Sequence, residues 1–351
     1  MKKKAILFKK LPNNKVMCTA CNHYCTPENW KTWKCGIRLN DNWELYLMTY
    51  WNAIWLHVDP VEKKPLYHFL PWSPVLSFWT AWCNFSCTFC QNREMSQQKW
   101  ENWNIEKWKN DGYNQFFWNE FISPKYIVDY CLNNNIPSIA YTYNEPTVFF
   151  EYAYETMKLA KKNQIKNIFV SNGFMSKECR EKLVKNWLLD AINIDLKSFS
   201  EEFYKNICGW RLQPVLDNIK FFWKHNVWVE LTTLIIPWLN DSDQELEKIA
   251  KFIYNVSPDI PRHISAFYPT YKMMDKPATP VETLEKAYQI GKKIWLNFVY
   301  IGNVLDSWYE DTYCPKCNEK IINRIWFTIH NFFQKPWICP KCWENIVGRR
   351  N

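Results

Sequence analysis

The chain has 351 residues, of which 47% are hydrophobic and 23% are charged, and its formal net charge is +9. This size and apolar content indicate a globular protein with one large domain and attachments, or with two domains. No apolar run reaches the ~18 residues that span a bilayer, and the first lysines lead into an apolar stretch too short for a signal peptide. We therefore predict a cytoplasmic protein with no membrane partner. The lysines are scattered among acids, which does not indicate nucleic-acid binding.

Residues 1–72 form the first predicted region, which is rich in turns and cysteines. The cysteines follow the spacing C-x2-C-x3-C-x9-C, and His23 lies among them. Thiolates and imidazole suit a structural zinc ion, or a second iron–sulfur cluster that relays electrons. The spacing is not specific for either, and we slightly favour zinc. The predicted ligands are Cys18, Cys21, Cys25 and Cys35.

Residues 73–305 alternate predicted strands and helices. Helices are expected to begin at Ser123-Pro124, at Ser242 and at Pro280, where a capping residue or proline precedes a helical stretch. The alternation predicts an α/β fold with a parallel sheet or an open barrel of βα units, with active-site residues at the carboxyl ends of the strands. The polar stretch 97–119 is predicted to be an inserted loop. The expected strands are 75–78, 138–143, 167–171, 190–196, 227–236, 263–267 and 297–301.

Residues 306–351 form a short tail with two C-x2-C pairs. Fourteen cysteines in a reducing compartment favour metal ligands over disulfides. Two such knuckles are typical of a zinc ribbon, in which four thiolates complete a closed tetrahedral site and stabilise a segment too small for its own core. We predict zinc ligands at Cys314, Cys317, Cys339 and Cys342.

The chain has 7 glycines and 22 tryptophans, where average usage predicts roughly 25 glycines. Tryptophan also stands where turns prefer glycine, as in Pro71-Trp72 and Pro237-Trp238. The two tail knuckles read CPKCN and CPKCW, so Asn318 and Trp343 occupy the same position. We infer that many of these tryptophans replace glycine in the working protein, because a codon read as glycine by the organism was translated as tryptophan. The alternative is a protein that is truly rich in tryptophan.

Cys83, Cys87 and Cys90 follow the expected strand 75–78 in the spacing C-x3-C-x2-C. Three thiolates at this spacing are suited to three irons of a [4Fe-4S] cluster, with the fourth iron left open. A structural zinc ion would need a fourth protein ligand, and none lies nearby in the sequence. The position directly after a strand at the head of a βα series strengthens the cluster interpretation.

With these residues the sequence resembles the radical S-adenosylmethionine (SAM) superfamily, whose signature includes an aromatic residue, here Phe89, before the last cysteine. Over nearly the whole chain it resembles the AmmeMemoRadiSam-system radical enzymes, which are similar to pyruvate formate-lyase activating enzymes. The resemblance implies a partial (β/α)6-type open barrel. The family has glycine where this chain has Trp82 and Trp238. The stretches that carry the resemblance are 59–69, 83–92, 141–147, 171–174, 195–197, 234–241 and 300–304.

The resemblance also implies roles for residues near the bound SAM. Glu145 would receive the ammonium group in a charge-assisted bond. Asn172, Asp195 and Lys197 would lie near the ribose hydroxyls and the methionine carboxylate, and Phe89 would border the adenine. A lone histidine is more often structural, and an Asp–Lys pair is equally typical of an exposed ion pair. The predicted cofactor-binding residues are Phe89, Glu145, Asn172, Asp195, Lys197 and His263.

These observations favour a radical enzyme that cleaves SAM reductively and abstracts hydrogen from a protein or small molecule. Its expected partners are an electron donor such as flavodoxin or ferredoxin and possibly a protein substrate, with a protein glycine as a natural candidate for the hydrogen donor. One alternative is an RNA-binding or RNA-modifying protein, for which the tail offers Lys341, Arg349 and Arg350 together with the aromatic residues Phe332 and Phe333. Another is an electron carrier, although a carrier would need only the metal clusters and not the βα series.

Overall fold

The computed structural model describes residues 2–97, 121–304, 308–325 and 328–350. The chain divides into two compact units, which we call unit 1 (residues 1–59 and 74–190) and unit 2 (residues 60–73 and 191–351). The predicted boundaries at 72 and 305 stay predictions. The expected loop 97–119 falls, except for its first residue, outside the described residues. None of the helices in the described ranges has the length and apolarity needed to cross a bilayer.

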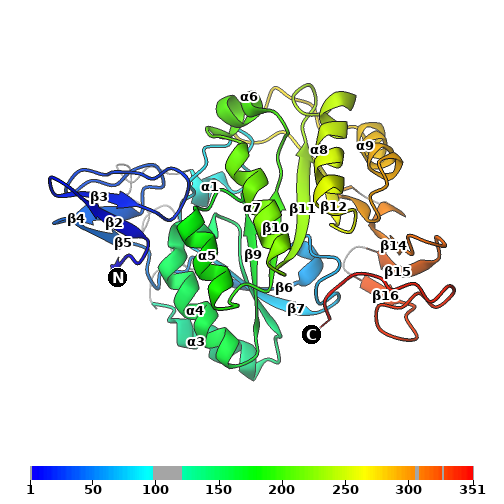
Figure 1. Ribbon diagram of the computed structural model, residues 1–351, viewed down its shortest axis with the longest axis horizontal. Helices are drawn as coiled ribbons and strands as arrows, with labels where there is room; N and C mark the ends of the chain where they lie inside the picture. The colour runs from blue at the N-terminus through cyan, green and yellow to red at the C-terminus, as the bar shows by residue number, and fades with distance from the viewer. Residues whose placement is uncertain (1, 98–120, 305–307, 326–327, 351) are drawn as a thin grey trace. The chain divides into compact units, whose positions relative to one another are not determined.

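Unit 1 contains a parallel sheet in which β8 pairs with both β7 and β9 (Figure 1). All four residues of β8 are buried, as expected for a parallel strand covered on both faces. Helix α3 begins as predicted, because Ser123 accepts a hydrogen bond from the amide of Tyr126 and Pro124 opens the first turn. The elements of this core are β6 Trp55–Pro60, β7 Pro74–Trp79, α1 Arg93–Ser96, α3 Pro124–Asn133, β8 Ser138–Tyr141, α4 Phe150–Lys162, β9 Lys166–Ser171 and α5 Lys177–Lys185.

The amino-terminal part of unit 1 is built from short antiparallel strands. β5 pairs with β1 and with β4, and β2 pairs with β3 as a hairpin. Their bounds are β1 Lys3–Lys4, β2 Phe8–Leu11, β3 Lys15–Cys18, β4 Arg38–Asp41 and β5 Glu44–Leu47. Two of the four predicted amino-terminal ligands therefore lie close to strands, with Cys18 ending β3 and Cys35 preceding β4.

Unit 2 holds four parallel strands in the order β13-β12-β11-β10. Helices α8 and α9 lie side by side in Figure 1 and pack against each other. Helix α8 begins at the predicted cap, where Ser242 accepts from the amide of Glu245, and α9 follows Pro280 as expected. The elements are β10 Ala191–Asp195, α6 Glu201–Phe203, α7 Gln213–Lys224, β11 Trp228–Ile235, α8 Asp243–Val256, β12 Arg262–Ala266, α9 Val281–Lys293 and β13 Val299–Gly302.

The tail of unit 2 forms a small antiparallel sheet, β14 Thr312–Tyr313, β15 Lys320–Ile325 and β16 Thr328–Asn331. A cluster of buried side chains lies around its cysteines, with Tyr67, Phe298, Tyr300, Ile321 and Ile346 among its members. The α/β fold with a mostly parallel sheet is confirmed, and every predicted strand of the core is present within a few residues of its expected bounds.

Many tryptophans have a backbone conformation that favours glycine. Their φ values lie between 50 and 70°, whereas none of the phenylalanines in the described ranges has positive φ. Trp187 and Trp295 stand one residue beyond the caps of α5 and α9, at the position where helices commonly end with a left-handed glycine. The turn geometry expected from the sequence is therefore present. The positive-φ tryptophans are Trp30, Trp43, Trp51, Trp72, Trp82, Trp187, Trp238, Trp295, Trp337 and Trp343.

Candidate radical SAM site and two further cysteine groups

Cys83, Cys87 and Cys90 lie on one loop of unit 1, residues 80–92, which we call the cluster loop. It follows β7 directly and ends at the cap of α1. The amide of Phe85 lies 3.4 Å from the Cys83 sulfur, and the Ser96 hydroxyl lies 3.0 Å from the Cys90 sulfur. Donors to sulfur tune the properties of iron–sulfur clusters. The three thiols, two of which have such neighbours, form a suitable ligand set for a cluster.

Asparagine side chains hold the cluster loop in place. Asn144, just after β8, donates to the carbonyl of Trp82 at 2.8 Å, and Asn92 donates to the carbonyl of Tyr143 at 2.8 Å. Sequence reasoning missed both residues, because asparagines in loops are common and their partners are distant in sequence. The loop is therefore tied to the carboxyl end of the neighbouring strand by side-chain hydrogen bonds.

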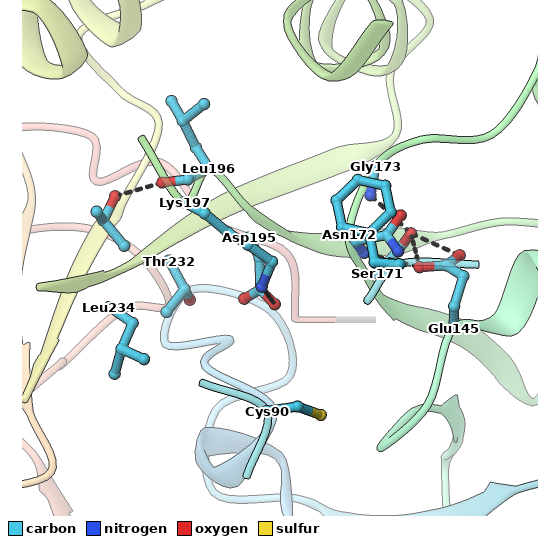
Figure 2. A network of polar contacts seen from close by, with 12 residues as sticks. Cys90, Glu145, Ser171, Asn172, Gly173, Asp195, Leu196, Lys197, Thr232 and Leu234 are labelled. Carbon is cyan, nitrogen blue, oxygen red and sulfur yellow. Dashed lines mark hydrogen bonds and ion pairs between the residues drawn. The ribbon is translucent and has the colours of Figure 1, made fainter. Parts of the chain in front are cut away.

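Glu145 is 1% exposed and connects the ends of two strands (Figure 2). Its carboxylate accepts from the amide and hydroxyl of Thr147, from the Ser171 hydroxyl, and from the amide of Asn172 at 2.8 Å. Burial raises the pKa of this carboxyl, and the hydrogen bonds oppose that shift. Most of its acceptor capacity is already used within the protein. Glu145 thus positions the loop after β9, and its predicted contact with the SAM ammonium stays a prediction.

Asn172 follows β9 and is directed at the cluster loop. Its side-chain amide donates to the Asn84 side-chain oxygen at 2.8 Å and lies 3.8 Å from the Cys83 sulfur. Its own side-chain oxygen accepts from the amide of Phe174 at 3.0 Å. Gly173 has φ 71°, a conformation that a side chain disfavours. The prediction placed Asn172 near the SAM ribose or carboxylate, and the structure adds a contact with a predicted cluster ligand.

In unit 2, Asp195 ends β10 and pairs with Lys197 two residues later. The Lys197 ammonium lies 2.8 Å from the Asp195 carboxylate, and the lysine side chain is the more buried of the two, 13% exposed against 37%. Asp195 is in register with Thr232 on β11, and Figure 2 shows the two side chains near each other. The pair therefore lies at the carboxyl end of a parallel strand, where α/β proteins bind ligands.

His263 and Phe89, the other predicted cofactor neighbours, are both buried. His263 in β12 makes a 2.7 Å hydrogen bond with the carboxylate of Glu230, which also accepts from the amides of Tyr67 and His68 and from the Trp228 indole. These interactions hold the pKa of Glu230 below its usual range against the opposing effect of burial. The structure thus gives His263 a structural partner, and its predicted role beside SAM is untested.

Comparison with known proteins identifies the family. Residues 77–253 match the family model described as the radical SAM superfamily. The chain belongs to this superfamily. Over 326 residues it is 38% identical to an uncharacterized protein from Methanocaldococcus jannaschii, covering 93% of this chain and 92% of the relative. A second protein of that organism, named as a putative glycyl-radical enzyme activating enzyme, is 27% identical over 66% of this chain and 80% of its own length.

Solved structures resemble this radical SAM chain more weakly. A domain of a pyruvate-formate lyase-activating enzyme from Bacteroides vulgatus is 18% identical and covers 47% of this chain and 98% of its own, with a TM-score of 0.39. At that score the likeness adds no argument.

Membership in the superfamily implies a [4Fe-4S] cluster and SAM. Two further groups of four cysteines lie outside the cluster loop of this radical SAM protein. The carboxy-terminal quartet, Cys314, Cys317, Cys339 and Cys342, has all its sulfurs within 4.8 Å of one another. Two sulfur pairs across the quartet are 3.6 Å apart.

Reciprocal contacts join the two knuckles of the carboxy-terminal quartet. Lys316 pairs with Glu344 at 3.0 Å, and Lys341 pairs with Glu319 at 3.1 Å. Asn318 and Trp343 have φ of 58° and 61°, so the two knuckles share one backbone conformation. The quartet is a closed, symmetric site made of four thiols.

The amino-terminal quartet, Cys18, Cys21, Cys25 and Cys35, is arranged differently. Its four residues line one pocket in unit 1, together with His23 and Arg38. Within the described residues, only the carboxy-terminal quartet gathers three or more metal-ligating side chains closely enough to hold a single ion. The amino-terminal thiols therefore surround a space instead of converging on a point.

Proposed function

We propose that this protein is a radical SAM enzyme of the AmmeMemoRadiSam type that acts on a protein or small molecule in the manner of glycyl-radical activating enzymes. The observation that carries the proposal is the cluster loop itself, which follows the first strand of a parallel sheet and lies beside side chains from the ends of the next two strands. Asn172 reaches the Cys83 sulfur, and Glu145 holds the loop that carries Asn172. The name of the 27% identical relative supports the activating role.

Cys83, Cys87 and Cys90 would hold three irons of the cluster. When bound, the cluster would supply the electron for reductive cleavage of SAM to methionine and a 5'-deoxyadenosyl radical, and that radical would take a hydrogen atom from the substrate. Asn172, Asp195 and Lys197 would bind the polar groups of SAM. In this proposal Phe89 borders the adenine, and His263 lies near the ligand.

For the tail we propose a zinc ribbon. Four thiolates bound to one zinc at about 2.3 Å in a tetrahedron lie about 3.8 Å apart. This value agrees with the 3.6 Å sulfur pairs of the carboxy-terminal quartet. Lys316 and Lys341 form ion pairs with glutamates, which leaves little support for RNA binding at this end of the tail. The proposed core fold is the open (β/α)6-type barrel, and the proposed electron donor is a flavodoxin or ferredoxin.

Anaerobic reconstitution with iron and sulfide tests the enzymatic proposal. After reduction, the protein with SAM should produce methionine and 5'-deoxyadenosine in equal amounts, and Cys87→Ala should produce neither. The control is Cys131→Ala, which changes a buried thiol on α3 outside the three cysteine groups. A fully loaded cluster that leaves SAM intact under reducing conditions would refute the proposal.

A further inference from the structure

The four cysteines of the amino-terminal quartet line one pocket, but within the described residues they are not gathered closely enough to hold a single ion. Cys18 and Cys21 are buried, and Cys25 and Cys35 are half-buried. A zinc ion would draw four thiolates to about 3.8 Å from one another and leave no cavity between them. The carboxy-terminal quartet has that form, and the amino-terminal quartet does not.

A cluster of several irons and sulfides requires the wider arrangement. Its thiolate ligands attach to the outside of the inorganic core, so the sulfurs lie far apart with a volume between them. The cysteines of the cluster loop behave in the same way, since they too form no close group that suits one ion. Both cysteine groups of unit 1 therefore differ from the tail quartet, because their sulfur atoms are not all gathered within a few ångströms of one another.

A buried cation lines the same cavity. Arg38 is 4% exposed, and its guanidinium is held by two hydrogen bonds to Glu151, at 2.7 and 3.2 Å, and by one to the carbonyl of Val148. Four thiolates with their metal carry net negative charge, and the guanidinium of the Arg38–Glu151 pair lies at the edge of this pocket, with its charge balanced by the Glu151 carboxylate. By contrast, the lysines paired across the tail quartet, Lys316 and Lys341, are exposed.

The segment of the amino-terminal quartet also contacts the cluster loop. The His23 ring nitrogen Nε2 lies 2.8 Å from the carbonyl oxygen of Asn84, the residue that follows Cys83. Asn22 is bound to the loop after β9 as well, through the carbonyl oxygens of Phe174 and Met175. His23 lines the cavity, so a single side chain separates the quartet from the backbone of the cluster loop.

We propose that Cys18, Cys21, Cys25 and Cys35 hold a second iron–sulfur cluster, which passes electrons to the cluster on the cluster loop past His23. The electron-transfer role rests on the proposed function, and the metal assignment does not. In each transfer a one-electron protein donor of the flavodoxin or ferredoxin class is oxidised by one electron and the second cluster is reduced by one. That electron then moves to the first cluster, which returns the second cluster to its oxidised state.

The metal assignment is tested in the variant Cys83→Ala/Cys87→Ala/Cys90→Ala, which removes the first cluster. After anaerobic reconstitution it should retain about four irons and four sulfides per chain, with the broad absorption of a thiolate-bound cluster. Adding Cys18→Ala and Cys25→Ala should remove this iron, whereas adding Cys339→Ala should leave it unchanged. Zinc without iron in the triple variant would overturn the assignment, and so would iron that disappears with Cys339→Ala. Because no SAM cleavage is measured, this result is independent of the proposed function.

The relay is tested by changing the reductant. In Cys25→Ala we expect 5'-deoxyadenosine formation with reduced flavodoxin to fall at least tenfold, and formation with dithionite, a small reductant, to change less than twofold. Iron analysis of the same sample should still show about four irons for the first cluster, which excludes a folding failure. Cys131→Ala is the matched control. If Cys25→Ala and the protein without this substitution form 5'-deoxyadenosine at the same rate with reduced flavodoxin, the proposed electron relay is wrong.

Discussion

The cysteine sites of unit 1 and unit 2 differ in what holds them together. In unit 2 the carboxy-terminal quartet is gathered within 4.8 Å, and two ion pairs join its knuckles. In unit 1 the thiols are spread, and hydrogen bonds from Asn144 and Asn172 fix the surrounding loops. The four thiols of the tail can thus hold their own short segment together around one ion. The cysteines of the cluster loop are instead held in position by residues at the ends of the neighbouring strands.

The largest effect on activity is expected from substitutions in the cluster loop. Replacing Cys83, Cys87 or Cys90 by Ala should abolish 5'-deoxyadenosine production, because a cluster held by two thiolates is not retained. The thermal unfolding midpoint should change little, since the loop is fixed by side-chain hydrogen bonds. Product analysis and differential scanning calorimetry measure the two quantities. Full turnover in any of the three variants would contradict the assignment of the loop.

The opposite result is expected for the carboxy-terminal quartet. Cys339→Ala should lower the bound zinc from about one ion per chain to near zero, because a structural site needs all four ligands. The tail should become sensitive to proteolysis, while the iron content stays the same. Metal analysis and limited digestion provide the readouts. If this variant loses iron and the unchanged protein contains no zinc, the tail is a cluster domain.

The substitution Glu145→Gln tests whether side-chain hydrogen bonds hold the site in unit 1 in place. All groups that its carboxylate contacts are donors, so in Glu145→Gln the amide nitrogen would face a donor. We expect a loss of about 1–3 kcal/mol in the free energy of unfolding, the usual cost of an unsatisfied buried polar group. Denaturant titration measures it. SAM affinity, measured separately, should fall by about 1.5–3 kcal/mol if the carboxylate also receives the ammonium. Unchanged stability would show that Glu145 is not a positioning residue.

The smallest effects concern one tryptophan in each unit. Trp187 and Trp343 have φ of 50° and 61°, and both side chains are exposed. Left-handed φ costs a residue with a Cβ roughly 1–2 kcal/mol. Trp187→Gly and Trp343→Gly should therefore each raise the free energy of unfolding by about that amount, as denaturant titration would measure. Trp228→Gly is the control and should destabilise, because Trp228 is buried in β11 and its indole donates to Glu230.

Peptide mass spectrometry of the natively produced protein tests the recoding hypothesis directly. It should find glycine at Trp72, Trp82, Trp238 and Trp343 and tryptophan at Trp228. Tryptophan at all five positions would refute recoding, and the backbone at these turns would then need another explanation.

The sequence by itself determined the features that depend on neighbouring residues. Periodicity and capping located the strands and the starts of α3 and α8, since these signals act within a few residues. The spacing of Cys83, Cys87 and Cys90 indicated one loop around one cluster, and Pro-Trp pairs indicated turns with positive φ at Trp72 and Trp238.

Only the tertiary structure decided the features that depend on contacts between distant residues. The spacing of the amino-terminal quartet did not select a metal, because the metal preference depends on how far apart the folded backbone holds the sulfurs. The packing of Glu145 against Ser171 and Asn172, and of His23 against Asn84, brings together side chains from separate strands and loops. No local pattern encodes such contacts, since each partner has a common residue type and becomes a neighbour only when the sheet forms.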